Sequence, residues 1–130
     1  MSATKGLEAW HRVVEGRTQP DELAAIIRED AVFHSPVVHS PQRGRALVVA
    51  YLAAAGKTLG NASFHYVREL VDGENALLEF ETELDGIHVN GVDLIRFDNE
   101  GMIADFKVMV RPLKAVNKVW EAMAAQLAKG

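Results

Sequence analysis

Hydrophobic residues between positions 7 and 27 recur every three or four residues, which is the spacing of amphipathic helices. Two helices are predicted here, because Pro20 followed by two acidic residues is typical of an opening helical turn. The buried positions of the first helix are Leu7, Trp10, Val13 and Val14. Those of the second helix are Leu23, Ile26 and Ile27.

The same spacing returns after Gly44 and again near the end of the chain. A third helix is predicted to end at Gly60 and Asn61. Its inner positions are Leu47, Val48, Tyr51, Leu52, Ala55 and Leu59. The last helix, residues 113–127, is predicted to bury Leu113, Val116, Trp120, Met123 and Leu127. Residues 31–35 indicate a short strand that ends at Pro36.

From residue 62 the hydrophobic period changes to two, which predicts four strands. Turns are predicted at Asp72–Gly73, near Asp85–Gly86 and at residues 98–101, so the strands follow one another as an antiparallel meander. Helices followed by hairpin-linked strands favour the α+β class. We expect a cone-shaped, curved antiparallel sheet with helices packed on its concave face around one pocket.

Strand alternation sorts the side chains into an inner and an outer face. In residues 78–84 the apolar positions and Thr82 share the inner face, and three glutamates share the outer, solvated face. In residues 102–111 the inner face is wholly apolar. On the outer face, Asp105 and Lys107 could pair.

Strand 87–97 carries the most informative residue. Its inner face is predicted to consist of Ile87, Val89, Gly91, Asp93, Ile95 and Phe97. Asp93 is therefore a carboxylate among apolar neighbours, and burial should raise its pKa. Such a residue is a candidate for acid–base chemistry. The alternative is that Asp93 has a structural role, as a cap or as a partner of a buried Tyr or His.

Composition narrows the class of protein. The chain has 130 residues, no cysteine and a net charge of −4, and its basic residues are scattered. This favours one domain over residues 1–130, and neither a thiolate site nor nucleic-acid binding is expected. Neither a signal peptide nor an apolar run long enough to span a membrane is seen, so a cytoplasmic location without membrane contact is predicted.

The chain contains no complete sequence motif for binding a metal or a cofactor. His34 and His39 lie five residues apart, but no third ligand accompanies them. Glycines near Lys57 do not have the spacing of a phosphate-binding loop. No metal and no cofactor are therefore predicted, and general acid–base chemistry remains. Tyr51 or Tyr66 could donate a hydrogen bond there.

Three stretches, residues 27–36, 92–97 and 101–111, together with the order of the elements, resemble the nuclear-transport-factor-2-like superfamily. The chain is most similar to its SnoaL-like and ketosteroid-isomerase-like branches. The resemblance implies a pocket between sheet and helices and frequently a homodimer packed through the sheet. Here the outer positions Val92, Leu94 and Met109 would contribute to that interface.

The resemblance also implies roles for particular residues. In ketosteroid isomerases an Asp before the proline that ends the first strand is the proton-shuttling base, and Ser35 stands at that position. A second Asp that donates a hydrogen bond to the steroid oxygen corresponds to Asp93. The family's Tyr on the first helix is replaced by Trp10, or by His11 if the alignment shifts by one residue. SnoaL-type polyketide cyclases pair an inward Asp with a His, which Asp93 could do with His34, His39 or His11.

We therefore predict a catalytic group of Asp93, Ser35 and His34. The predicted substrate-binding residues are Trp10, Phe33, His39, Tyr51, Phe80, Ile95, Phe106, Val108 and Trp120. The predicted function is a cofactor-independent isomerase, cyclase or lyase acting on a small apolar oxygenated molecule, such as a polyketide, steroid or terpenoid. The alternatives are a non-catalytic ligand-binding module and a dimerisation domain whose pocket is only core.

Overall fold

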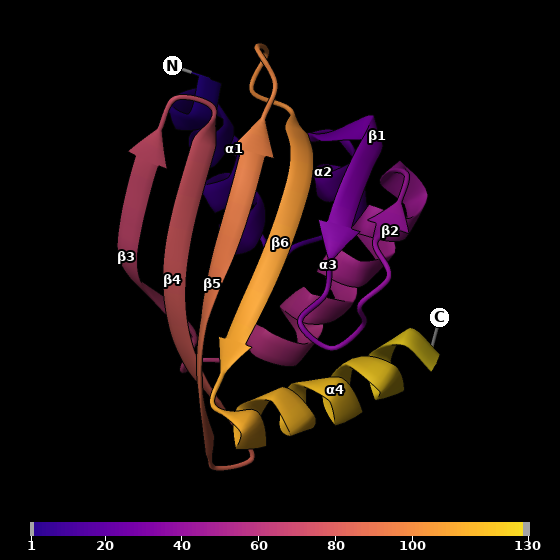
Figure 1. Ribbon diagram of the computed structural model, residues 1–130, viewed down its shortest axis with the longest axis vertical. Helices are drawn as coiled ribbons and strands as arrows, with labels where there is room; N and C mark the ends of the chain where they lie inside the picture. The colour runs from indigo at the N-terminus through magenta and orange to yellow at the C-terminus, as the bar shows by residue number, and fades with distance from the viewer. Residues whose placement is uncertain (1, 129–130) are drawn as a thin grey trace.

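The computed structural model describes residues 2–128, which form four helices and six strands (Figure 1). The helices are α1 (Ser2–Glu15), α2 (Pro20–Ala24), α3 (Arg45–Leu59) and α4 (Leu113–Ala128). The strands are β1 (Ile27–His34), β2 (Gln42–Arg43), β3 (His65–Asp72), β4 (Asn75–Leu84), β5 (Ile87–Phe97) and β6 (Ile103–Arg111).

All six strands belong to one sheet, in the order β2-β1-β6-β5-β4-β3. Strands β3 to β6 form the predicted meander, with each neighbour antiparallel. The sheet as a whole is mixed, because β1 pairs with β6 in parallel. The sequence did not predict this pair, since its two strands are separated by about 70 residues of chain, nor did it predict the short strand β2.

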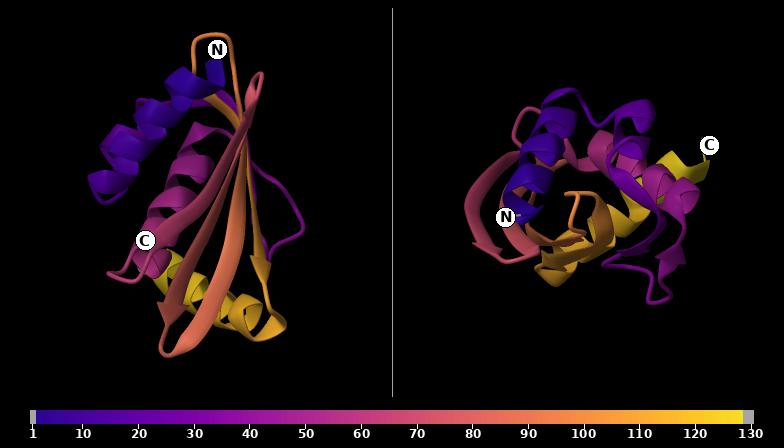
Figure 2. Two further views of the ribbon diagram at one scale, coloured as in Figure 1. Left: turned by 90° about the vertical axis from the view of Figure 1, so that its left-hand side faces the viewer. Right: turned by 90° about the horizontal axis from the view of Figure 1, so that it is seen from above.

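The helices pack against the concave face of the curved sheet, as expected for the predicted α+β class. Figure 2 shows α1 and α3 on one side of the sheet and α4 crossing its lower end. The core between these layers contains four phenylalanines that are almost completely buried: Phe33, Phe80, Phe97 and Phe106. Sheet curvature and helix cover together leave a space that these side chains only partly fill.

Three local predictions were wrong, and the first is Leu47, which was expected on the inner side of α3 and is 45 % exposed. The second helix ends at Ala24, and Ile27 is buried as the first residue of β1, where it pairs with Ile103. The predicted strand 31–35 therefore begins four residues earlier. In α4 the buried positions are Ala115, Val119 and Met123, whereas Leu113 is 75 % and Trp120 is 59 % exposed.

The outer face of the sheet also differs in one pair. The sequence left open a pair between Asp105 and Lys107 on the same strand. Instead Oδ1 of Asp105 lies 2.9 Å from Nε2 of His34, on the parallel neighbour β1. Within residues 2–128 no helix has both the length and the apolar composition that crossing a bilayer requires.

Candidate functional site

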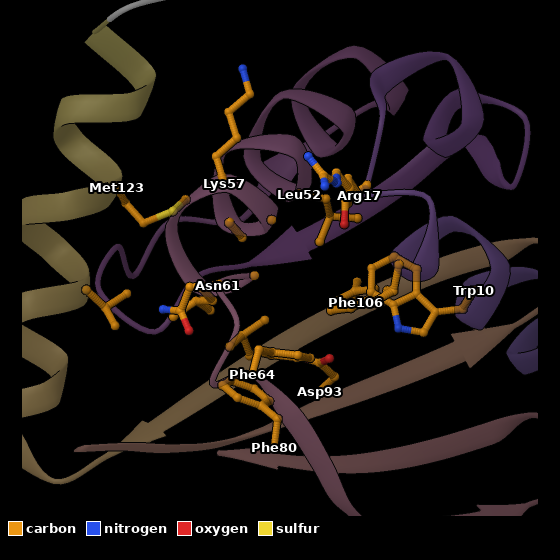
Figure 3. A pocket seen from close by; sticks show the side chains of 18 of the residues that line it. Trp10, Arg17, Leu52, Lys57, Asn61, Phe64, Phe80, Asp93, Phe106 and Met123 are labelled. Atoms are coloured by element: carbon orange, nitrogen blue, oxygen red, sulfur yellow. The ribbon is translucent and has the colours of Figure 1, made fainter. Parts of the chain in front are cut away.

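A cavity of about 810 Å³ lies between the concave face of the sheet and the helices. This volume is within the usual range for small-molecule sites, roughly 300–1,000 Å³. Its wall is mainly aromatic and aliphatic, formed by Trp10, Val14, Phe33, Leu52, Phe64, Phe80, Phe106, Val108, Val110, Val119 and Met123. Figure 3 shows Asp93, Phe64 and Phe80 on one side of the cavity, and Arg17, Leu52 and Lys57 on the opposite side.

Asp93 is the one carboxyl group among the described residues that line this cavity. It lies in the middle of β5, between Leu78 of β4 and Val108 of β6, and only 6 % of it is exposed. Its Oδ2 accepts a hydrogen bond from the hydroxyl of Tyr66 at 3.3 Å. Its Oδ1 has no hydrogen-bond partner among residues 2–128, and this atom is not fully buried. Oδ1 therefore keeps access to the cavity.

Burial raises the pKa of Asp93 from 3.8 to about 7, because the apolar surroundings disfavour the charged form. The hydrogen bond from Tyr66 acts in the opposite direction, since it stabilises the carboxylate and lowers the pKa. At neutral pH the protonated and ionised forms of Asp93 are thus both populated. A group in this state can accept a proton and return it within one reaction cycle.

Tyr66 connects Asp93 to the first helix. Nε1 of Trp10 donates a hydrogen bond to the Tyr66 hydroxyl oxygen at 3.0 Å, and this hydroxyl in turn donates to Asp93. Burial, followed by the nearby Asp93, raises the pKa of Tyr66 well above its ordinary value, so Tyr66 remains a donor. Its ring packs edge-on against Phe64 at a centroid distance of 5.2 Å. This chain of contacts fixes the orientation of the Asp93 carboxyl group.

Gly91 shapes the wall beside Asp93. A Cβ atom at this position would lie 2.5 Å from Cζ of Phe80 and 2.8 Å from the carbonyl oxygen of Met109. Neither distance is compatible with a side chain, so only glycine allows the Phe80 ring to lie across β5. The ring then stacks against Phe64, with centroids 5.3 Å apart. The glycine therefore helps to form the aromatic floor of the cavity.

Ser35 lines the cavity directly after β1. Its Oγ accepts a hydrogen bond from the backbone amide of Val37 at 3.1 Å, which leaves its hydroxyl hydrogen available to a ligand. In the sheet, His34 is level with Lys107, and Asp93 is level with Val108. Ser35 and Asp93 thus flank β6 from its two neighbouring strands, about 10 Å apart at two strand spacings.

The cavity opens between the α1–α2 loop and the end of α3. Its exposed lining residues are Arg17, Gln19, Pro20, Lys57, Gly60, Asn61 and Ala62. The loop is fixed on α3 by Thr18, which is 8 % exposed. A Cβ atom on Gly56 would lie 2.7 Å from Cβ of Thr18, so the glycine permits this close contact. We call the seven exposed lining residues the cavity mouth.

Seven of the predicted site residues line the cavity: Asp93, Ser35, Trp10, Phe33, Phe80, Phe106 and Val108. The other five do not. His34 pairs with Asp105 on the outer face, and His39 is exposed in the loop between β1 and β2.

The last three lie near the cavity wall or away from it. Tyr51 packs against Phe33 with ring centroids 5.6 Å apart, so it supports a wall residue from behind. Ile95 is fully buried in the core, two residues beyond Asp93 and on the same face of the strand. Trp120 is on the exposed side of α4, because the buried stripe of that helix runs through Val119 and Met123.

The sequence interpretation missed the cavity mouth altogether. Arg17, Lys57 and Asn61 lie in a loop or at a helix end, where no hydrophobic period indicates the direction of a side chain. It also named Tyr66 only as one of two possible donors. The spacing of Phe64 and Tyr66 by two residues was the available signal; in the structure Phe64 precedes β3, and both side chains are half-buried while the other residues of β3 are exposed.

Comparison with known proteins places the chain in a family. Residues 7–106 match the model of the SnoaL-like domain. A steroid delta-isomerase from Pseudomonas aeruginosa is 35 % identical, with a TM-score of 0.90 over 98 % of this chain and 93 % of that chain. The chain therefore belongs to the SnoaL-like domain family, as the sequence predicted.

Two further solved structures have the same fold. An uncharacterised protein with a cystatin-like fold from Silicibacter pomeroyi DSS-3 is 31 % identical, with a TM-score of 0.82 over 91 % of this chain and 84 % of that chain. An NTF2-like protein of unknown function from Mesorhizobium loti is 22 % identical, with a TM-score of 0.72 over 86 % of this chain and 95 % of that chain. The nuclear-transport-factor-2-like fold is thus confirmed. No curated protein sequence matched the chain.

Proposed function

We propose that this protein is an isomerase that moves a proton within a small, mostly apolar, oxygenated molecule, with Asp93 as the proton carrier. The observation that carries the proposal is the free Oδ1 of a buried carboxyl group that opens into an apolar cavity. The pKa of about 7 supports it, because both forms of the group are then populated at neutral pH. The cofactor-independent chemistry predicted from the sequence remains part of this proposal.

The proposed reaction converts a β,γ-unsaturated ketone into its conjugated isomer. The Asp93 carboxylate removes a proton from the carbon between the carbonyl group and the double bond, and the electron pair moves onto the carbonyl oxygen as a dienolate. The protonated Asp93 then returns the proton to the far carbon, and the carboxylate is regenerated. Ser35 is the proposed donor to the substrate oxygen, since its hydroxyl hydrogen is free.

Two further facts favour isomerisation over chemistry that needs two catalytic groups. Asp93 is the one carboxyl group along the described cavity wall, and none of the histidines lines the cavity, so one group has to accept and return the proton. The Pseudomonas aeruginosa relative is called a steroid delta-isomerase, and its reaction class is the same. A steroid-like or similarly apolar ring system is therefore the proposed substrate.

The test uses androst-5-ene-3,17-dione as the substrate and measures the formation of the conjugated enone by ultraviolet absorbance. We expect Asp93→Asn to lower kcat by about 10²-fold or more, because the amide cannot carry the proton. Asp105→Asn is the matched control, since it makes the same substitution on the outer face of the sheet. Equal turnover in wild type and Asp93→Asn would overturn the proposed role.

A second candidate function is binding without catalysis. The observation that favours it is Ser35, which stands where the resemblance places a catalytic base. Prolonged incubation of a bound ligand distinguishes the two. Recovery of the unchanged molecule from wild type, for each β,γ-unsaturated ketone that binds, would favour a carrier or sensor over an isomerase.

A further inference from the structure

The cavity mouth carries two cationic side chains, Arg17 and Lys57. Among residues 2–128 neither forms an ion pair. Arg28, Arg68 and Lys118, by contrast, each have a carboxylate partner. No carboxyl group other than Asp93 lines the described cavity, and Asp93 lies on the opposite side (Figure 3). The mouth therefore has two cationic side chains without an ion pair among the described residues, although Lys57 also borders a second hollow that is lined by Glu83, Asp85 and Glu121.

Two amide side chains lie beside these cations and already have protein partners, since Asn61 donates to the carbonyl oxygen of Glu83 at 2.7 Å. Asn61 and Gln19 both line the mouth, and the side-chain amide of Gln19 donates to the carbonyl oxygen of Arg17 at 3.3 Å. Arg17 and Thr18 both have positive φ angles, of 70° and 54°. Two successive non-glycine residues in this conformation are uncommon, and such strain is often found at ligand sites.

The α1–α2 loop is held in place by backbone hydrogen bonds. The amide of Arg17 donates to Val14 at 3.1 Å, and that of Thr18 donates to Val13 at 2.9 Å. Thr18 is also packed against Gly56. The backbone of Arg17 is thus fixed at the opening while its exposed side chain can reach a ligand.

We propose that Arg17 and Lys57 form an anion subsite, and that the ligand is amphipathic, with an apolar body in the cavity and an anionic group, such as a carboxylate or a phosphate, at the mouth. The inference deepens the proposed function and rests on it only in using the same cavity. It gives the substrate a direction, in which the anionic end faces solvent and the reacting part lies against Asp93. The steroid-like ring system of the proposed function would then carry an anionic group at the end that faces the mouth.

The test compares two fluorescent dyes that have the same aromatic body. 8-Anilinonaphthalene-1-sulfonate carries a sulfonate group, whereas N-phenyl-1-naphthylamine is neutral. The quantity measured is the ratio of their Kd values for each protein. We expect the Arg17→Gln/Lys57→Gln double variant to reduce the preference for the anionic dye about tenfold, because two partly exposed charge contacts are lost.

The matched control is the Arg12→Gln/Lys114→Gln double variant, which loses the same charge from exposed positions that do not line the cavity. Its ratio should stay within about twofold of wild type. Raising the salt concentration should reduce the wild-type preference, since ions screen exposed charges. An unchanged ratio in the Arg17/Lys57 variant would overturn the subsite, and so would a failure of both dyes to bind wild type.

Displacement of the neutral dye by dodecanol, dodecanoate and dodecyl phosphate identifies the head group. Stronger displacement by either anion, lost in the Arg17/Lys57 variant, supports the subsite, and the stronger of the two anions names its class. Equal displacement by all three overturns it. Dye binding requires no turnover, so this result is independent of the Asp93→Asn kinetics that test the isomerase.

Discussion

Replacing Asp93 with Asn should make the protein more stable at high pH and leave its stability almost unchanged at low pH. The pKa of Asp93 is about 7 in the folded protein, compared with 3.8 for the ordinary group. Below pH 3.8 both the folded and the unfolded state hold the proton. Between the two values only the folded state holds it, so the free energy of unfolding decreases as the pH rises. Above pH 7 the buried carboxylate is charged, and its full cost is present.

The size of this effect follows from the difference between the two pKa values. About 3 pH units at about 1.4 kcal/mol per unit give a loss of about 4 kcal/mol between pH 4 and pH 8. Asn has the same shape as Asp and its oxygen can still accept the hydrogen bond from Tyr66. The variant has no charge to bury, so this part of the pH dependence should be absent.

Urea unfolding of wild type and Asp93→Asn at each pH from 4 to 8 measures the prediction directly. The free energy of unfolding of the variant should increase relative to that of wild type as the pH rises. Most of this increase should occur between pH 4 and pH 7. Glu8→Gln, which removes an exposed carboxyl group from α1, serves as the control and should follow the wild-type profile. A constant difference between wild type and Asp93→Asn at every pH would refute the idea that burial of this charge is costly.

Three further predictions concern single residues. Tyr66→Phe removes the hydrogen bond that lowers the pKa of Asp93, so the apparent pKa in the pH profile of kcat/KM should rise above 7; an unchanged profile would show that Tyr66 does not tune Asp93. Gly91→Ala should destabilise the protein by about 1–3 kcal/mol in urea unfolding, because its Cβ atom overlaps the Phe80 ring; a stability equal to wild type would contradict this packing. Trp120→Gln should change the free energy of unfolding by less than about 0.5 kcal/mol and leave dye binding intact, since the side chain is 59 % exposed; weaker dye binding would return Trp120 to the ligand site.

The sheet was the part of the fold that the sequence predicted best. Strand β5 alternates so regularly that one register buries Asp93, while the other would bury Arg96 and expose Phe97. Turn residues between the meander strands defined the hairpins. The parallel pairing of β1 with β6 could not be predicted, because no local pattern indicates a contact between strands that are so distant in sequence.

Helix α4 shows why the helical parts were harder to predict. It has apolar residues on more than one side, so two stripes are possible. The larger residues, Leu113 and Trp120, suggested one of them, but the protein buries the stripe that starts at Ala115. A small residue lets a helix approach its neighbours closely, and hydrophobicity alone does not reveal that advantage. Trp120 was therefore assigned to the substrate site although it faces outward.

The residues of the candidate site show the same difference between strands and the other elements. Positions on strands, such as Asp93 and Phe106, could be assigned from alternation. Arg17 and Lys57 could not, because the direction of a side chain in a loop or at a helix end depends on how the loop packs. The homodimer through the sheet and the cytoplasmic location remain predictions. Exposure of Met109 at 47 % on the outer face agrees with such an interface without identifying a partner.

The pairing of β1 with β6 has a consequence for how the protein acquires its site. Strands β3 to β6 join through short turns and can assemble as hairpins, but β1 cannot take its place until β6 has been synthesised. Ser35 and Asp93, which flank β6, come together only at that point. During translation the early helices and β1 therefore lie beside an incomplete sheet, and the candidate site is among the last features to form. A ligand that binds in the cavity would therefore stabilise only chains that have completed this final pairing.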